Sequence, residues 1–240
     1  MKLPNNTIWH LTHSSNAIKL ANKLIIFDYP LAEKEVTDTD GIENGFIIPG
    51  QINKEDVFVF ISHGHQDHFS PGIFGWKDKI ERIKFIVSSD IKDCPDDVLL
   101  VAPNQTHAID DIRLKTYSST DCGVAFSLFI GDKHIFYSGD NGFWNWAGGI
   151  DDDKYYEEAL AQIDTSKPID LAFQICDPRL EKNGAGGIYV FVRYFAPEIL
   201  IPLHLFGNYE FLRRVDAELK AQGFRKRFWC IEKRGARYSF

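Results

Sequence analysis

The stretch "ISHGHQDHFS", residues 61–70, places three histidines and an aspartate within six positions, directly after the apolar run "VFVF" at 57–60. The whole chain has 8 histidines, so this short segment holds a large share of them. The apolar run predicts a buried strand that ends at Ser62. The polar segment after it is either a solvated loop or part of a site with its own chemistry.

The spacing of these side chains favours a metal site. Residues i and i+2 of an extended segment point to the same face, so His63 and His65 can share one ion. Gly64 allows a tight backbone between them. Asp67 and His68 follow where the chain turns, and we expect them to project toward a second position nearby. Because imidazole nitrogens and carboxylate oxygens both suit zinc, we interpret the H-x-H-x-D-H order as one segment's contribution to a two-metal site.

The bulk properties predict a single soluble domain over residues 1–240. A chain of 240 residues can bury a substantial core. The net charge is −7, and the one basic concentration, at 223–237, is too diffuse to reverse it, so we expect a small-molecule substrate and no nucleic-acid partner. The sequence leaves the oligomeric state open.

The compartment is predicted from the cysteines and from the apolar runs. The four cysteines are widely spaced without a C-x-x-C pair, which favours free thiols in a reducing compartment. No apolar run approaches the roughly 20 residues of a membrane span, and the first residues do not resemble a secretory signal. We therefore expect a cytoplasmic protein that does not enter a membrane.

Short β-rich runs alternate with turns and helical segments, which predicts an α+β fold. Two runs of strands, each with helices after it, predict two sheets packed together with helices outside. No repeat is visible in the sequence, and we expect the glycine-rich stretch 182–187 to be a mobile loop. The expected elements are a hairpin over 17–30, strands at 56–62, 84–89, 111–119, 123–139 (a hairpin), 170–176 and 227–234, and helices at 71–83, 151–164 and 209–223.

Three further segments match one protein family in the expected order. They are "LTHSSNAIKLANKLIIFDYP" at 11–30, "IFYSGDNGFWNW" at 135–146 and "ILIPLHLFGNYE" at 199–210. Together with the histidine motif they resemble the metallo-β-lactamase superfamily over nearly the whole chain. The resemblance implies an α+β fold arranged as an αββα four-layer sandwich. The detail of "STDCGVAF", "GDNGFWNW" and "CDPR" resembles a bacterial branch related to the ascorbate-6-phosphate lactonase group.

The resemblance implies a metal-dependent hydrolase. A metal-bound hydroxide would attack a small ester, lactone or phosphodiester. The implied cofactor is zinc, one or two ions, and an oxygen-rich ligand shell also admits manganese or iron. Asp67 would, in addition to binding metal, orient the attacking water. The implied metal ligands are His63 and His65 at site one, Asp67, His68 and His204 at site two, and Asp140 between the two sites.

The chain departs from the family pattern at Ser119. The superfamily usually supplies another histidine there, and a serine hydroxyl is a poor metal ligand. Three outcomes are open: water completes site one, Asp121 or His13 reaches into it, or site one is weak and site two dominates. His13 is otherwise either a group that lines the site or a hydrogen-bonded structural residue. The departure also motivates an alternative function, a non-catalytic or weakly active metal-binding sensor on the same fold.

Four other side chains are candidates for the surroundings of the metals. Asp28, at a strand end, is expected to accept a hydrogen bond from a ligand imidazole. Arg179 either binds a phosphate or carboxylate of the substrate or pairs with Asp177 to hold a loop. Trp144 and Trp146 either wall a substrate pocket or pack in the core.

Overall fold

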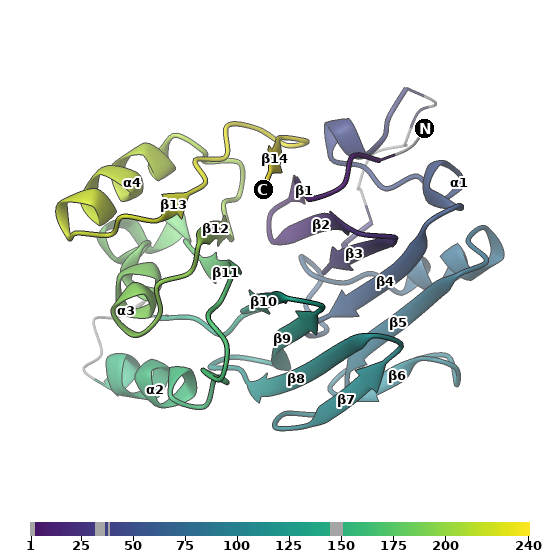
Figure 1. Cartoon of the computed structure of the whole chain (residues 1–240), viewed down its shortest axis with the longest axis horizontal. Helices are drawn as coiled ribbons and strands as arrows, with labels where there is room; N and C mark the ends of the chain where they lie inside the picture. Colours follow the sequence, from purple (N-terminus) through teal and green to yellow (C-terminus); the bar gives the residue numbers. More distant parts are fainter. Residues whose placement is uncertain (1–2, 32–36, 38, 145–150) are drawn as a thin grey trace. The chain divides into compact units, whose positions relative to one another are not determined.

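The computed structural model describes residues 3–31, 37, 39–144 and 151–240 of the chain (Figure 1). Trp146 therefore lies outside the described residues. The chain divides into two compact units: the first comprises Met1–Val101 and Ile231–Phe240, and the second comprises Ala102–Cys230. The single domain over 1–240 stays a prediction.

The first unit is built on a seven-stranded sheet in the order β14-β1-β2-β3-β4-β5-β6. The pairs from β14 to β3 are antiparallel, and the pairs from β3 to β6 are parallel. The predicted hairpin over 17–30 corresponds to β2 and β3, which turn at Ala21 with a φ of 52°. The strands are β1 (Thr7–Thr12), β2 (Ser15–Leu20), β3 (Lys23–Phe27), β4 (Asp56–Ile61), β5 (Ile83–Ser88), β6 (Leu99–Val101) and β14 (Arg237–Ser239).

The second unit holds another seven-stranded sheet, in the order β13-β12-β11-β10-β9-β8-β7. The pairs from β7 to β10 are antiparallel, and the pairs from β10 to β13 are parallel. The strand expected over 227–234 is shorter than predicted, since only two residues pair with β12. The strands are β7 (Thr106–Ile109), β8 (Ile112–Ser118), β9 (Val124–Ile130), β10 (Lys133–Tyr137), β11 (Leu171–Ile175), β12 (Ile199–Leu203) and β13 (Arg227–Phe228).

The two sheets share one pattern of strand directions. Each has three antiparallel pairs followed by three parallel pairs, so β1, β3 and β4 correspond to β8, β10 and β11. This repeat is not visible in the sequence. Strand pairing uses backbone groups, which every residue type supplies, so two halves can share a topology without sharing side chains.

Helices connect the strands within each unit. The first unit contains α1 (Pro49–Ile52) and the 3₁₀ helices η1 (Ile42–Asn44) and η2 (Pro71–Asp78). The second contains α2 (Asp151–Leu160), η3 (Pro178–Asn183), α3 (Gly186–Tyr194) and α4 (Phe211–Ala221), and α3 contacts both β11 and α2. None of the helices among the described residues has the length and apolar character that a membrane crossing requires.

Two of the expected local structures are wrong. The segment 71–83 is not an α-helix: η2 is a 3₁₀ helix that ends at Asp78, and its buried side chains Ile73 and Trp76 are three residues apart, which matches the 3₁₀ period. The expected mobile loop over 182–187 instead contains the start of α3. A Cβ at Gly186 would lie 2.7 Å from the Phe143 ring, so this glycine permits close packing.

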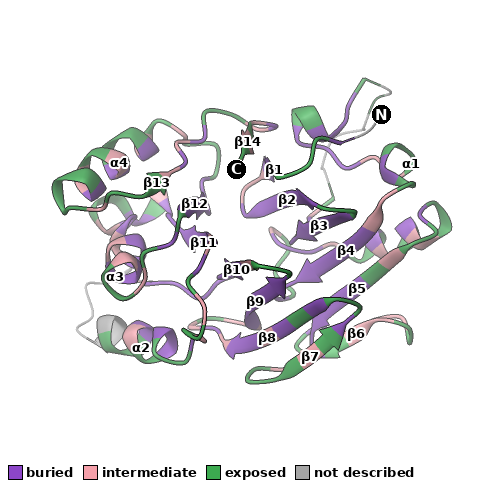
Figure 2. Cartoon of the chain, viewed as in Figure 1, coloured by how far each residue is buried: buried purple, intermediate pink, exposed green. Residues whose placement is uncertain are grey.

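Helix α4 and the hairpin β9–β10 agree with the sequence. Gly223 follows α4 with a φ of 90° and donates its N–H to the carbonyl of Lys220, as expected for a glycine that closes a helix. Every residue of β3, β9, β11 and β12 is buried, whereas β7 is largely exposed (Figure 2). The core of each sheet therefore lies on its central strands.

Candidate metal centre

The first-unit cluster, His13, Asp28, His63, His65, Asp67 and His68, is assembled at strand ends. His13 directly follows β1, Asp28 directly follows β3, and the remaining members follow β4. His13 and Asp28 have φ values of 36° and 39°, in the left-handed region. Residues other than glycine seldom adopt this conformation, and histidine and aspartate are among those that do so most readily. The backbone thus turns sharply at His13 and at Asp28, directly after the end of each strand.

Asp28 is the buried acceptor at the base of this cluster. Its Oδ1 accepts the backbone N–H of Ser62 at 2.7 Å, and its Oδ2 accepts the Ser62 hydroxyl at 2.6 Å. The same Oδ2 lies 2.8 Å from Nδ1 of His68. Ser62 Oγ in turn lies 2.9 Å from Nδ1 of His63. All four residues are fully buried, so these contacts are shielded from water.

These contacts determine which nitrogen of each imidazole carries the proton. An ionised carboxylate only accepts hydrogen bonds, so Nδ1 of His68 is the donor to Asp28. The Ser62 hydroxyl gives its own proton to Asp28, so its oxygen accepts from Nδ1 of His63. In the neutral imidazoles the lone pair is then on Nε2. A lone pair on one nitrogen, with a hydrogen-bond acceptor behind the other, is the arrangement of a metal-binding histidine.

The imidazole rings of the histidine motif are gathered closely. The ring centroids of His63 and His65 are 4.6 Å apart, and those of His63 and His68 are 4.2 Å apart. His63 and His68 are buried, whereas His65 is exposed. One candidate ligand atom from each of Asp28, His63 and His68 lies within 4.8 Å of the others. The three imidazoles of the motif therefore lie close together, and their role as metal ligands stays a prediction.

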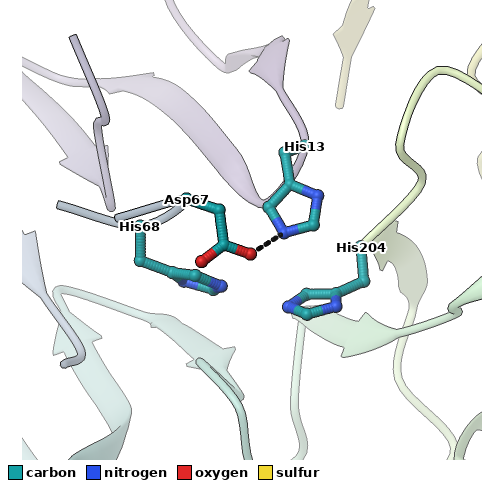
Figure 3. Close-up of side chains that lie close together, drawn as sticks. All are labelled: His13, Asp67, His68 and His204. Carbon is teal, nitrogen blue, oxygen red and sulfur yellow. Dashed lines mark ion pairs between the residues drawn. The ribbon is translucent and has the colours of Figure 1, made fainter. Parts of the chain in front are cut away.

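His13 contacts the carboxylate of the motif. Its Nε2 lies 3.0 Å from Oδ2 of Asp67, the pair that is joined by a dashed line in Figure 3. This hydrogen bond lowers the pKa of Asp67 well below its usual value, more than burial raises it. Asp67 is therefore ionised at any pH near neutrality. The ring of His13 also meets that of His68 edge-on, at 5.4 Å between centroids.

The second-unit cluster consists of Asp140, Asp177 and His204, which follow β10, β11 and β12. His204, also labelled in Figure 3, has a φ of 64° and is almost completely buried. Its Nε2 lies 2.8 Å from Oδ1 of Asp140, and its Nδ1 lies 3.2 Å from Oδ2 of Asp177. Both ring nitrogens are thus engaged by carboxylates.

Arg179 forms a multiple ion pair with Asp177. Its backbone N–H and its Nε bind Oδ1 at 2.9 and 3.0 Å, and its Nη2 binds Oδ2 at 2.6 Å. Burial raises the pKa of Asp177, but hydrogen bonds from His204 and Arg179 lower it to about 2. Of the two alternatives for Arg179, the structure shows the pair with Asp177. The guanidinium also stacks on the exposed ring of Phe206, 3.7 Å from its centroid.

The remaining predicted residues lie in the second unit. The Ser119 hydroxyl accepts the backbone N–H of Asp121 at 3.1 Å, and Ser119 is buried whereas Asp121 is exposed. The Trp144 indole N–H donates to the backbone carbonyl of Asp140 at 3.0 Å, and its ring lies 5.3 Å from that of His204. Trp144 therefore packs on the second-unit cluster.

The sequence did not identify Asp177 as a site residue. It follows a buried strand in "CDPR", and the C-terminal ends of parallel strands are where ligand-binding groups gather. Its contact with His204 joins residues 27 apart. This contact depends on the register in which β11 and β12 pair, which the sequence alone does not show.

The distances between nitrogen and oxygen atoms within each cluster are compatible with two side chains that bind the same metal ion. Two atoms bound to one zinc at roughly 2.0–2.1 Å in tetrahedral geometry lie about 3.3 Å apart. The pairs His13–Asp67 and His204–Asp140 are separated by 3.0 and 2.8 Å, close to this value and also within the range of an ion pair. The donor set, imidazole with carboxylate, is that of catalytic zinc sites.

Solved structures of other proteins share the fold of this chain. No family model and no curated protein matches the sequence. The metallo-β-lactamase fold protein YhfI from Bacillus subtilis aligns with 97% of this chain and 98% of its own, at 14% identity and a TM-score of 0.62. The chain has the metallo-β-lactamase fold. The α+β, αββα fold class expected from the sequence is therefore confirmed.

Other proteins of this fold align equally well. A protein from Parabacteroides distasonis with the provisional name metal-dependent hydrolase aligns over 94% of this chain and 93% of its own, at 17% identity and a TM-score of 0.63. CmlA, a diiron β-hydroxylase from Streptomyces venezuelae, aligns over 100% of this chain but 55% of its own, at 13% identity and a TM-score of 0.63. At such identities, the metallo-β-lactamase fold is shown but not a shared activity. The lactonase branch stays a prediction.

Proposed function

We propose that this chain is a metal-dependent hydrolase that acts on a small-molecule ester, lactone or phosphodiester. The observation that carries the proposal is the pair of buried imidazoles, His63 and His68, whose Nδ1 atoms are held by Ser62 and Asp28. This leaves Nε2 of each ring as the metal-binding atom. The provisional hydrolase name of a protein with the same fold supports the reaction class.

The histidines and aspartates of the two clusters are suitable ligands for a metal ion. A bound ion would lower the pKa of a water molecule toward about 7 and polarise the electrophilic carbon or phosphorus of the substrate. Zinc suits the imidazole-rich first-unit cluster, in one or two ions, and manganese or iron suits a shell richer in oxygen. The proposed protein ligands are His63, His65, Asp67 and His68 of the first unit, and Asp140 and His204 of the second.

The chain's own groups have separate tasks in this proposal. Asp28 fixes the orientation and the tautomer of the imidazoles behind the metal ligands. The Asp67 side chain is partly exposed, so its carboxylate can orient an attacking water as well as bind metal. Trp144 and the exposed Phe206 contact His204 and offer an apolar surface to a substrate. The net charge of −7 favours a small molecule over a polyanion.

The proposal is tested with the full chain after its metal has been removed and then restored in measured amounts. We expect hydrolysis of at least one member of a panel of lactones, phosphodiesters and simple esters, in proportion to the metal restored. Asp140→Ala and His68→Ala should each remove that activity, whereas His107→Asn, on the exposed strand β7, should not. Full activity in Asp140→Ala would contradict the assignment of that residue.

A second function is favoured by one observation. The Ser119 hydroxyl, which stands where the superfamily usually has a histidine, is engaged by the backbone N–H of Asp121. A site that lacks this ligand suits a non-catalytic or weakly active metal sensor. Protein that binds metal stoichiometrically, and yet hydrolyses no member of the panel faster than free metal does, would favour the sensor.

A further inference from the structure

His13 lies in a tight turn with a left-handed backbone. Strands β1 and β2 are joined by two residues, His13 and Ser14, and the pairing of the two strands is irregular between His10 and Thr12. His13 has a φ of 36°. Short hairpin turns with a positive φ are dominated by glycine, asparagine and aspartate. A bulky residue in such a conformation, beside an irregular strand, is often retained for a function.

The side chain of His13 points at two members of the histidine motif. Its Nε2 lies 3.0 Å from Oδ2 of Asp67, and its ring meets that of His68 edge-on (Figure 3). One candidate ligand atom from each of His13, Asp67 and His68 lies within 4.8 Å of the other two. The His13 side chain is 9% exposed and that of Asp67 is 42% exposed, so the cluster is buried on the His13 side and open to solvent at Asp67.

The donor atoms around His13 match a known type of metal site. His68 donates from Nδ1 to Asp28, which leaves its Nε2 as a lone pair. Two imidazole nitrogens and one carboxylate oxygen form the ligand set of His₂–carboxylate catalytic zinc sites, which keep their fourth position open for water or substrate.

We propose that His13 is a metal ligand and that it forms, with Asp67 and His68, a three-ligand metal site contained entirely in the first unit. The inference rests on the proposed metal dependence and deepens it. The family resemblance assigns no ligand to the opening hairpin, so His13 would add a ligand to the expected set. The chain would thereby bind one ion with three ligands from its first unit.

Two variants separate a ligand from a hydrogen-bond donor. His13→Asn removes the imidazole, and asparagine tolerates the left-handed backbone. His13→Gln supplies an amide N–H that can reach Asp67, but it is a poor ligand for zinc. His107→Asn removes an imidazole from β7 of the second unit and is the control. Thermal melting of the metal-free proteins establishes that each variant is folded.

The experiment is a titration of the metal-free full chain with Co²⁺, whose visible absorption reports its coordination, followed by zinc affinity measured against a competing chelator. We expect His13→Asn and His13→Gln each to lower the zinc affinity by at least about 10- to 100-fold, which is the usual cost of losing a residue that holds a metal ligand in place. Both variants should also change the Co²⁺ spectrum. His107→Asn should match the parent in both measurements.

Each other outcome overturns the inference in a distinguishable way. If His13→Asn keeps the affinity and the spectrum of the parent, His13 is not a ligand, and the proposed metal dependence stands. If His13→Gln restores the parent's values while His13→Asn does not, His13 acts as a hydrogen-bond donor to Asp67. If the parent binds neither ion, the proposed function fails together with the inference.

Discussion

Oδ2 of Asp28 lies 2.8 Å from Nδ1 of His68, and the same oxygen accepts the Ser62 hydroxyl that contacts His63. One buried carboxylate therefore orients two imidazoles of the histidine motif. This contact joins the end of β3 to the end of β4. Because it occupies the Nδ1 side of both rings, Nε2 of each ring is the candidate metal-binding atom.

Asp28→Asn is expected to weaken metal binding. The amide cannot accept from all the groups that the carboxylate satisfies, so the imidazoles lose their fixed tautomer. Zinc affinity should fall about 10- to 100-fold, as for other contacts behind metal ligands. Competition with a chelator measures this. The control is Asp97→Asn, which breaks an exposed ion pair with Lys77 in the same unit. An Asp28→Asn variant with the affinity of the control would show that the carboxylate is dispensable.

Arg179→Met is expected to make the protein more sensitive to acid. The pKa of Asp177 is lowered to about 2, so its contribution to stability is present above the unfolded pKa of roughly 3.9 and is lost as the pH falls toward 2. Removing Arg179 removes one of the groups that lower this pKa. The acid limb of stability should then move to higher pH, which thermal melting between pH 2 and 5 measures. Identical acid limbs would show that the ion pair does not act on Asp177.

His10 is expected to oppose folding in mildly acidic solution. Burial lowers its pKa to about 3, so the folded state keeps it neutral while the unfolded chain binds a proton below about 6.5. The free energy of unfolding should therefore decrease as the pH falls from 6.5 toward 3, by up to about 1.4 kcal/mol per pH unit.

The His10→Gln variant isolates this effect. Its unfolding free energy, measured by urea titration, should depend less on pH between 6.5 and 4 than that of the parent. Burial also lowers the pKa of His134, so part of the dependence should remain. A variant with the full slope of the parent would rule out His10 as its source.

Gly186→Ala is expected to destabilise the second unit although alanine favours helices. Its Cβ would lie 2.7 Å from the Phe143 ring, so the start of α3 would have to shift. Overpacking of this kind costs about 1–3 kcal/mol. Gly50→Ala in α1 is the control, because no atom lies within 4 Å of its new Cβ. Equal melting temperatures for the two variants would contradict this packing.

The elements that the sequence predicts well are those whose signals are local. The hairpin of β2 and β3, strand β4 and helix α4 with Gly223 depend on short apolar runs and on single turn residues. Helix α3 was missed, because its first turn contains glycines that serve packing against Phe143 and not flexibility. Such a requirement is visible only once the partner is in place.

The candidate site also has a part that local sequence predicts and a part that depends on contacts between distant residues. Six residues of one turn carry the H-x-H-x-D-H motif, so its metal-binding character can be predicted from spacing alone. The contact of Asp177 with His204 depends on the pairing of two strands, and that of His13 with Asp67 depends on a left-handed turn after β1. Neither contact has a signature in the sequence.

Elemental analysis of the purified full chain tests the central claim most directly. After dialysis against buffer that contains no free metal, the parent should retain one or two ions of zinc, manganese or iron per chain. His68→Ala, which removes an imidazole held by Asp28, should retain fewer. A parent that retains no metal, after expression in metal-replete medium, would contradict the assignment of a metal-dependent hydrolase.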